Sequence, residues 1–379
     1  PHTPAPERLA LISAARRAIS STSPVVANSS WGQGENVSMR AAFCTAPGTF
    51  ELRDLSRPLP NPGQALVRVR SCGICGSDLD WFGGPFPPPA VCPGHEIAGE
   101  VVELHGEVRE IEVGDRVVVE PLVVCGRCPA CKAGDYQICR EVEFLGVSRN
   151  GGFAEYVAVP RARLYPLPAE LDFAVGGLAE PAAVSVHGVR LGGVSSGDRV
   201  LVLGAGTIGL LCVMAARNAG AAEVAITARH AHQAEMAERI GATCVFPANP
   251  ERARTRAEGG NVFSPDVVLE TVGGGGESLN RAIRSVRPGG TVVLLGIFPS
   301  PPPCDALSLV VNEVRLVGAL TYGCRDGRSD FELALEMMAS NAPVVRDLVT
   351  HRFELEEIRG AFETAADKTQ GTIKVAVTP

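Results

Sequence analysis

Two patterns of apolar and polar positions divide the chain. Between residue 39 and about residue 178, short apolar or alternating segments are separated by turn residues. The segment 65–70 alternates as a half-buried strand does, and 40–44, 97–104 and 115–120 also have strand-like composition. A helix is expected over 180–191. This part of the chain is therefore predicted to be mostly β-structure.

After Gly197 the pattern changes to strands that alternate with helices. The expected strands are 199–203, 223–227, 266–270, 291–295 and 314–320, and the expected helices are 207–218 and 232–240. Such alternation predicts a parallel sheet covered by helices on both faces, and therefore an α/β protein. Residues 331–379 return to a mixture of helix and strand.

Charge and composition argue against two classes of partner, nucleic acids and membranes. The 379 residues include 35 Lys plus Arg and 42 Asp plus Glu, so the net charge is −7 and no nucleic-acid partner is expected. No apolar run approaches the roughly 20 residues of a membrane span, so no membrane partner is expected. The Pro-, Ser- and Asn-rich composition of residues 1–38 predicts a disordered or additional N-terminal extension, with a short helix over 7–19. We exclude this extension from the predicted fold.

A glycine-rich turn follows the predicted strand 199–203. Its sequence is Gly204-Ala-Gly206-Thr207-Ile208-Gly209, and a helix follows it directly. In this context the first glycine permits a tight turn, the second lets a pyrophosphate approach the backbone, and the third allows close helix packing. The turn therefore predicts a dinucleotide site, with a purely structural turn as the alternative.

The end of the next strand bears on which dinucleotide binds. An NAD site usually places an acidic residue there, whereas this chain has Ala228 followed by Arg229 and His230. A guanidinium suits the 2′-phosphate of NADP, so we expect NADP, with NAD as the alternative if these residues only form a solvated turn. Thr271, which follows strand 266–270, is also expected near the cofactor.

Cysteine and histidine residues predict two metal sites. Cys125, Cys128, Cys131 and Cys139 have the chemistry of a closed structural zinc site. Clustered thiols of this kind favour a reducing compartment, so a cytoplasmic location is expected. A scattered set can supply an open catalytic zinc, and its members are Cys75, His95, Glu96 and Glu180. Taken alone, Cys72 and Cys75 could instead be a redox pair, and His95 a core histidine.

In this order, the motifs around Cys75, His95, the four cysteines and Gly204 resemble those of zinc-dependent medium-chain dehydrogenases. The similarity runs from Met39 to the C-terminus and is greatest to the sorbitol, butanediol and threonine dehydrogenase branch. It implies a GroES-like, mostly-β catalytic domain over 39–185, to which 325–379 return, and a doubly wound Rossmann domain over 186–324. It also implies a homodimer or homotetramer.

The resemblance assigns roles by position. Cys75 and His95 would bind catalytic zinc, with Glu96 or Glu180 as a further ligand. Asp78 would accept a hydrogen bond from His95, and Ser77 would take the substrate's proton. The family often has a histidine where this chain has Asp80, so the proton would reach solvent either through Asp80 or through water.

These roles imply an oxidoreductase that moves a hydride between a nicotinamide cofactor and a secondary alcohol or polyol, or its ketone. The metal would act as a Lewis acid on the substrate oxygen. The alternatives are an NAD-dependent polyol or threonine dehydrogenase, and a non-catalytic zinc- and nucleotide-binding protein on the same scaffold. The aromatic residues Trp81, Phe82 and Phe86 are candidates for the substrate pocket, with simple packing of their loop as the alternative.

Overall fold

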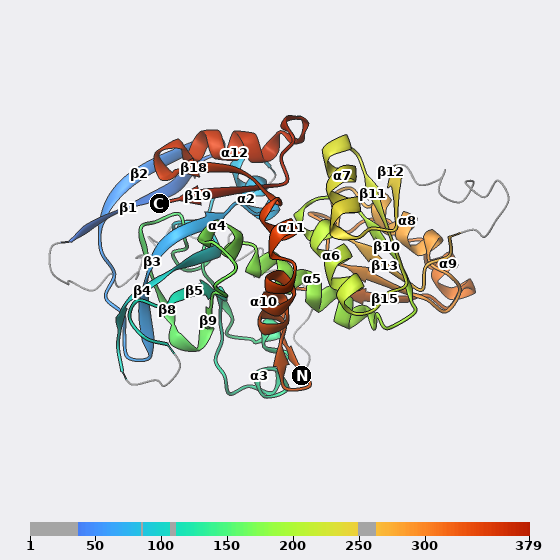
Figure 1. Ribbon diagram of the computed structural model, residues 1–379, viewed down its shortest axis with the longest axis horizontal. Coiled ribbons are helices and arrows are strands. Elements are labelled where there is room, and N and C mark those ends of the chain that lie inside the picture. The colour runs from blue at the N-terminus through green and yellow to red at the C-terminus, as the bar shows by residue number, and fades with distance from the viewer. Residues whose placement is uncertain (1–36, 85, 107–110, 249–262) are drawn as a thin grey trace.

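The computed structural model describes residues 37–84, 86–106, 111–248 and 263–379. The extension predicted over 1–38, including its helix over 7–19, lies outside these residues except for 37 and 38. Two large sheets stand side by side, and the helices α5 and α10 run between them (Figure 1). α5 spans Ala179–Gly192 and α10 spans Asp330–Ser340.

The first sheet has six parallel strands in the order β12-β11-β10-β13-β14-β15. This corresponds to the order 3-2-1-4-5-6 of the Rossmann fold, so the predicted doubly wound sheet is confirmed. The strands are β10 Arg199–Leu203, β11 Glu223–Ala228, β12 Cys244–Pro247, β13 Val267–Glu270, β14 Thr291–Leu294 and β15 Arg315–Gly318. The accompanying helices are α6 Thr207–Asn218, α7 Ala231–Ile240, α8 Glu277–Ser285 and α9 Ala306–Val311.

The second sheet has seven strands, in which β18-β19-β3-β4-β5-β9 follow one another and β8 also pairs with β3. The strands from the first part of the chain are β3 Gln64–Gly73, β4 Glu96–Leu104, β5 Arg116–Val119, β8 Tyr156–Pro160 and β9 Leu164–Pro166. The C-terminal strands are β18 Val349–Glu354 and β19 Lys374–Thr378. Because β19 pairs with β3, the end of the chain returns to the sheet that its beginning forms (Figure 1).

Smaller elements surround this sheet. The strands are β1 Ser38–Ala46, β2 Thr49–Ser56, β6 Leu122–Val123, β7 Glu143–Phe144, β16 Cys324–Arg325 and β17 Arg328–Ser329. The helices are α2 Gly76–Phe82, α3 Pro129–Lys132, α4 Phe173–Gly176, α11 Ala342–Arg346 and α12 Ile358–Ala366. Single 3₁₀ turns are η2 Tyr136–Ile138, η3 Arg161–Arg163, η5 Leu355–Glu357 and η6 Lys368–Gln370. In the described residues, no helix has the length and apolar composition that a membrane crossing needs.

Helices α5 and α10 are joined by a buried polar contact. Asp330 accepts hydrogen bonds from Arg190 (2.6 Å) and the Gly323 backbone (2.8 Å), and its Oδ2 lies 2.8 Å from His187 Nδ1. Around this contact, one apolar core runs from α5 into both sheets, because it contains Val118 of β5 as well as Val202 of β10. The two sheets are therefore fixed to each other by shared packing.

A second buried acid lies where the mostly-β part meets α10. Glu120 accepts hydrogen bonds from Arg163 (2.6 Å) and Tyr165 (2.9 Å), and the Tyr165 hydroxyl lies 3.1 Å from Ser329 Oγ at the start of α10. Burial raises the pKa of Glu120 to about 7, although the positive charge of Arg163 opposes this. This contact links the sheet to α10.

Candidate functional site

The turn before α2 and the start of β4 bring three candidate metal ligands together. Cys75 is the residue that caps α2, and His95 and Glu96 lie where β4 begins. One ligand atom from each lies within 4.8 Å of the others. A thiolate, an imidazole and a carboxylate form a donor set that suits zinc, and three protein ligands leave a position for substrate. The chemistry of the donors therefore fits a catalytic zinc ion.

His95 is buried beside a second carboxylate. Its Nδ1 lies 3.8 Å from Asp78 Oδ1, and both atoms are buried without a hydrogen-bond partner among the described residues. At this distance the expected hydrogen bond is not made, and Asp78 accepts instead with its other oxygen from the Cys75 backbone N–H (2.9 Å). Burial acts to lower the pKa of His95, but the negative charges of Asp78 and Cys75 raise it well above its usual value.

The Glu96 side chain is buried against Lys374 and Gly73. The Lys374 ammonium lies 2.6 Å from each carboxylate oxygen, and the side chains of both residues are almost completely buried. Gly73 of β3 also lies against this carboxylate, and any side chain there would overlap Glu96 Oε2. Sequence reasoning missed Lys374, because 278 residues separate it from Glu96. No spacing rule joins two such positions.

Glu180 faces the same cluster from the first turn of α5. Its carboxylate interacts electrostatically with His95, Glu96 and Lys374, but it lies outside the group whose ligand atoms approach within 4.8 Å. Burial, together with the negative charge of Glu96, raises the pKa of Glu180 to about 7. The structure thus brings all four scattered candidates to one place, with Glu180 slightly apart.

The side chains of Ser77 and Asp80 lie along α2, next to Cys75. Both are half-buried, and neither side chain has a hydrogen-bond partner among the described residues. Burial raises the pKa of Asp80 above its usual value. Because positions three apart lie on one face of a helix, Ser77 and Asp80 can form a path away from the cluster.

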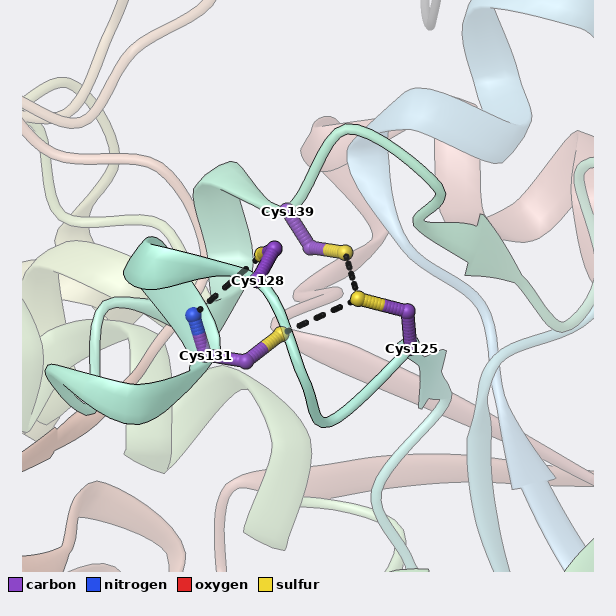
Figure 2. A group of neighbouring side chains, drawn as sticks. All are labelled: Cys125, Cys128, Cys131 and Cys139. Atoms are coloured by element: carbon purple, nitrogen blue, oxygen red, sulfur yellow. Dashed lines mark hydrogen bonds between the residues drawn. The ribbon is translucent and has the colours of Figure 1, made fainter.

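The four clustered cysteines meet in the segment around α3 and η2. All four sulfur atoms lie within 4.8 Å of one another, and Figure 2 shows that the side chains converge. Cys125 Sγ is 3.5 Å from Cys139 Sγ and 3.9 Å from Cys131 Sγ. Four converging thiols fit a closed tetrahedral zinc site and leave no position for a substrate.

The glycine-rich turn joins β10 to α6 as expected. Gly204 has a positive φ of 99°, which favours glycine, and a side chain at Gly209 would overlap the Gly204 carbonyl oxygen. A Cβ atom at Gly206 would meet no atom of the described residues within 4 Å. The backbone at the N-terminus of α6, where Thr207 and Ile208 begin the helix, is therefore open to an anionic ligand.

Two threonines support this turn. Thr227 Oγ1 accepts from the Gly204 N–H (2.9 Å), and Thr271 Oγ1 donates to the Leu203 carbonyl oxygen (2.8 Å). Thr271 thus lies beside the turn, as its position in the sequence predicts. In addition, Thr207 Oγ1 donates to the carbonyl oxygen of Ile373 (3.0 Å), which connects the turn to the C-terminal segment.

The end of β11 carries the predicted cofactor-selecting residues. Ala228 is buried as the last residue of the strand, and Arg229 is exposed immediately after it. Within the described parts of the chain, the Arg229 side chain has no ion pair or hydrogen bond. His230 follows as the N-cap of α7. A free guanidinium therefore stands at the end of the second strand.

One of the three aromatic pocket candidates, Phe82, is packed in the core. The ring of Phe82 is buried and packs against Phe50 and Phe362, at centroid distances of 5.8 and 5.2 Å. It belongs to an aromatic cluster that includes Phe362 of α12, because the face of α2 that carries it turns toward the core. Trp81 and Phe86 are only half-buried.

The chain is similar to known proteins over most of its length. Residues 61–169 match the family "Alcohol dehydrogenase GroES-like domain", and 207–340 match "Zinc-binding dehydrogenase". L-galactonate-5-dehydrogenase of Escherichia coli is 31% identical over 90% of this chain and 99% of its own length. Sorbitol dehydrogenase of Macaca fascicularis is 34% identical over 84% of this chain and 90% of its own length.

A solved structure extends the similarity to three dimensions. The zinc-binding dehydrogenase of Sinorhizobium meliloti 1021, bound to NADP, superposes with a TM-score of 0.80. It is 35% identical and covers 90% of this chain and 100% of its own. The predicted resemblance and the GroES-like and Rossmann architecture are thus confirmed. The chain belongs to the zinc-binding alcohol dehydrogenase family and is an NAD(P)-dependent oxidoreductase.

Proposed function

We propose that this dehydrogenase uses NADP and interconverts a secondary hydroxyl group of a polyol or sugar acid with the corresponding ketone. The observation that carries the proposal is the convergence of Cys75, His95 and Glu96 beside Glu180. The relatives named for sorbitol and L-galactonate favour a polyhydroxylated substrate over a simple alcohol. A non-catalytic role of the same scaffold is the alternative.

Each group at the site has a proposed task. Cys75 and His95 would hold the catalytic zinc with a carboxylate of Glu96 or Glu180. When bound, zinc supplies Lewis acidity toward the substrate oxygen. Ser77 accepts the hydroxyl proton of the substrate and passes it toward Asp80 and solvent. Asp78 stabilises the ring of His95 by its charge.

The cofactor would lie along the Gly204–Gly209 turn. The α6 N-terminus faces its pyrophosphate, and the open space at Gly206 allows close approach. We propose that Arg229 and His230 bind the 2′-phosphate. The absence of an acidic side chain at Ala228 and the NADP bound to the Sinorhizobium meliloti relative support NADP over NAD.

The four-cysteine segment would hold a second, structural zinc ion, which gives two zinc ions per chain. Its four thiols have to stay reduced to bind metal, and this supports a cytoplasmic location. We also propose the domain limits 39–185 with 325–379, and 186–324. The family matches over 61–169 and 207–340 support them.

A homodimer is proposed from the free edge of the parallel sheet. Among the described residues, β15 is the edge strand of this sheet, and α9, which precedes β15 in the chain, exposes Leu307, Val310 and Val311 by 70–75%. A strand edge can pair with its own copy about a two-fold axis, which would cover these side chains. We expect Val310→Asp to turn a dimer into a monomer in light scattering, whereas an unchanged mass would refute this interface.

The function is tested with zinc-loaded protein, NADP or NAD, and a panel of polyols, sugar acids, threonine and simple secondary alcohols. We expect reduced-nicotinamide absorbance to rise with polyhydroxylated substrates and NADP. Turnover confined to threonine or to NAD would contradict the proposed substrate or cofactor. If no reaction occurs although both zinc and NADP bind, the non-catalytic alternative is favoured.

A further inference from the structure

Lysine is rare in this chain, and one lysine near the candidate site has no acidic partner. Three of the 35 Lys and Arg residues are lysines, and two of them, Lys368 and Lys374, lie six residues apart. Lys374 pairs with Glu96. Lys368 is half-buried and forms no ion pair within the part of the chain that the structure describes. Its Nζ donates a hydrogen bond to the carbonyl oxygen of Ala365 (2.5 Å), a neutral group that leaves the positive charge uncompensated.

The surroundings of Lys368 disfavour its charged form. Burial lowers the pKa of this ammonium group, and the positive charge of Lys374 lowers it further. A partly desolvated cation beside a second cation costs free energy unless an anion compensates it. Ala365 lies near the C-terminal end of α12, and a lysine can cap such a carbonyl while it remains in water. Capping therefore does not explain the burial, whereas a bound anion would balance the charge.

The loop that carries Lys368 runs along the proposed cofactor site. It follows α12 and is directed toward α7 (Figure 1). At its start, Asp367 interacts electrostatically with His230, the N-cap of α7. At its end, the carbonyl oxygen of Ile373 accepts a hydrogen bond from Thr207 at the N-terminus of α6 (3.0 Å). The loop thus connects the region proposed for the 2′-phosphate with the region proposed for the pyrophosphate.

We propose that Lys368 is a cofactor-binding residue whose ammonium group contacts the pyrophosphate. Lys368 interacts with the charge of Lys374, whose Nζ lies 3.0 Å from the Ile74 carbonyl oxygen, so it faces the interior of the site and not Arg229. A pyrophosphate between α6 and this loop would meet the ammonium group on one side and the helix N-terminus on the other. This inference rests on the proposed cofactor site.

The experiment uses ligands that carry different phosphates. ADP has the pyrophosphate without the nicotinamide half, and adenosine 2′-monophosphate has only the 2′-phosphate. In calorimetric titration of the zinc-loaded protein, Lys368→Met should raise the Kd for NADP, NAD and ADP at least about tenfold. The Kd for adenosine 2′-monophosphate should change less than about twofold, which also reports a folded site. Arg229→Ala should do the reverse, weakening adenosine 2′-monophosphate and sparing ADP.

Two variants control for the change of charge. Lys368→Arg keeps the positive charge and should lose less ADP affinity than Lys368→Met. Arg359→Met removes an exposed charge from α12 and should leave the Kd of every ligand unchanged.

The outcomes separate the anions that Lys368 could bind. If Lys368→Met binds ADP as the wild type does, or binds all four ligands more weakly to the same degree, the inference is overturned. A loss confined to the KM of sugar-acid substrates would mean that the ammonium group binds a substrate carboxylate, and it would overturn the assignment to the cofactor. A wild-type protein that binds none of the four ligands would refute the proposed cofactor site itself.

Discussion

Replacing Arg229 by alanine should change cofactor preference without changing the fold. The side chain is exposed and has no partner among the described residues, so its loss should alter the free energy of unfolding by less than about 0.5 kcal/mol. In the proposed complex it faces the 2′-phosphate, a group that only NADP carries. The variant should therefore lose affinity for NADP and keep its affinity for NAD.

The size of the loss follows from the exposure of Arg229. Two unit charges at ~4 Å interact by about 1 kcal/mol in bulk water and about 4 kcal/mol near a protein surface. Because Arg229 is exposed, we expect a value of about 1–2 kcal/mol, which raises the Kd for NADP roughly 5- to 30-fold. The Kd for NAD should change less than about twofold, because NAD lacks the 2′-phosphate that Arg229 would face.

Calorimetric titration of the zinc-loaded protein with each cofactor measures both constants. Arg229→Lys is the matched control, because it keeps the positive charge but not the guanidinium fork, so it should lose less NADP affinity than Arg229→Ala. Equal weakening of NADP and NAD binding would refute the reasoning, since it would mean that Arg229 supports the site and does not read the phosphate. An unchanged Kd for NADP would refute it as well.

Three other changes have defined outcomes. The folded-state pKa of Glu120 is about 7, above its usual 4.5, so the folded protein favours the protonated carboxyl. The free energy of unfolding should therefore fall by about 3 kcal/mol as pH rises from below 4.5 to above 7. Denaturant unfolding measures this slope, which Glu120→Gln should lack. Gly73→Ala forces a methyl group onto Glu96 and should cost about 1–3 kcal/mol by the same measurement, whereas wild-type stability would contradict the packing described. Thr207→Val removes the hydrogen bond to Ile373 and should cost about 1 kcal/mol in unfolding experiments, with Thr207→Ser remaining like the wild type.

Local signals in the sequence predict most of the parallel sheet. Buried strands before helices, such as 199–203 before 207–218, have matching periodicity and a glycine turn between them, and the structure reproduces both ranges. The short strand β12 Cys244–Pro247 was not predicted. Its four residues are too few for a period, and its pairing with β11 decides its conformation.

Motif spacing likewise identifies the candidate ligands Cys75, His95 and Glu96, but not what surrounds them. Lys374 reaches Glu96 only because β19 returns to β3, a contact set by topology. The expected bond between Asp78 and His95 is not made, since Asp78 Oδ1 lies 3.8 Å from His95 Nδ1 while its Oδ2 caps the start of α2. Sequence patterns therefore indicate donor types, whereas hydrogen-bond partners depend on the assembled chain.

The most direct test of the account measures zinc content and NADP reduction together in the wild type and two cysteine variants. The wild type should hold two zinc ions per chain and lose turnover of its polyol substrate on chelation, with recovery on zinc addition. Cys75→Ser should abolish turnover and keep the structural zinc ion. Cys128→Ser should lose the structural zinc ion and be less stable than the wild type. Full turnover by zinc-free protein, or by Cys75→Ser, would contradict the claim that Cys75, His95 and a carboxylate form a catalytic zinc site.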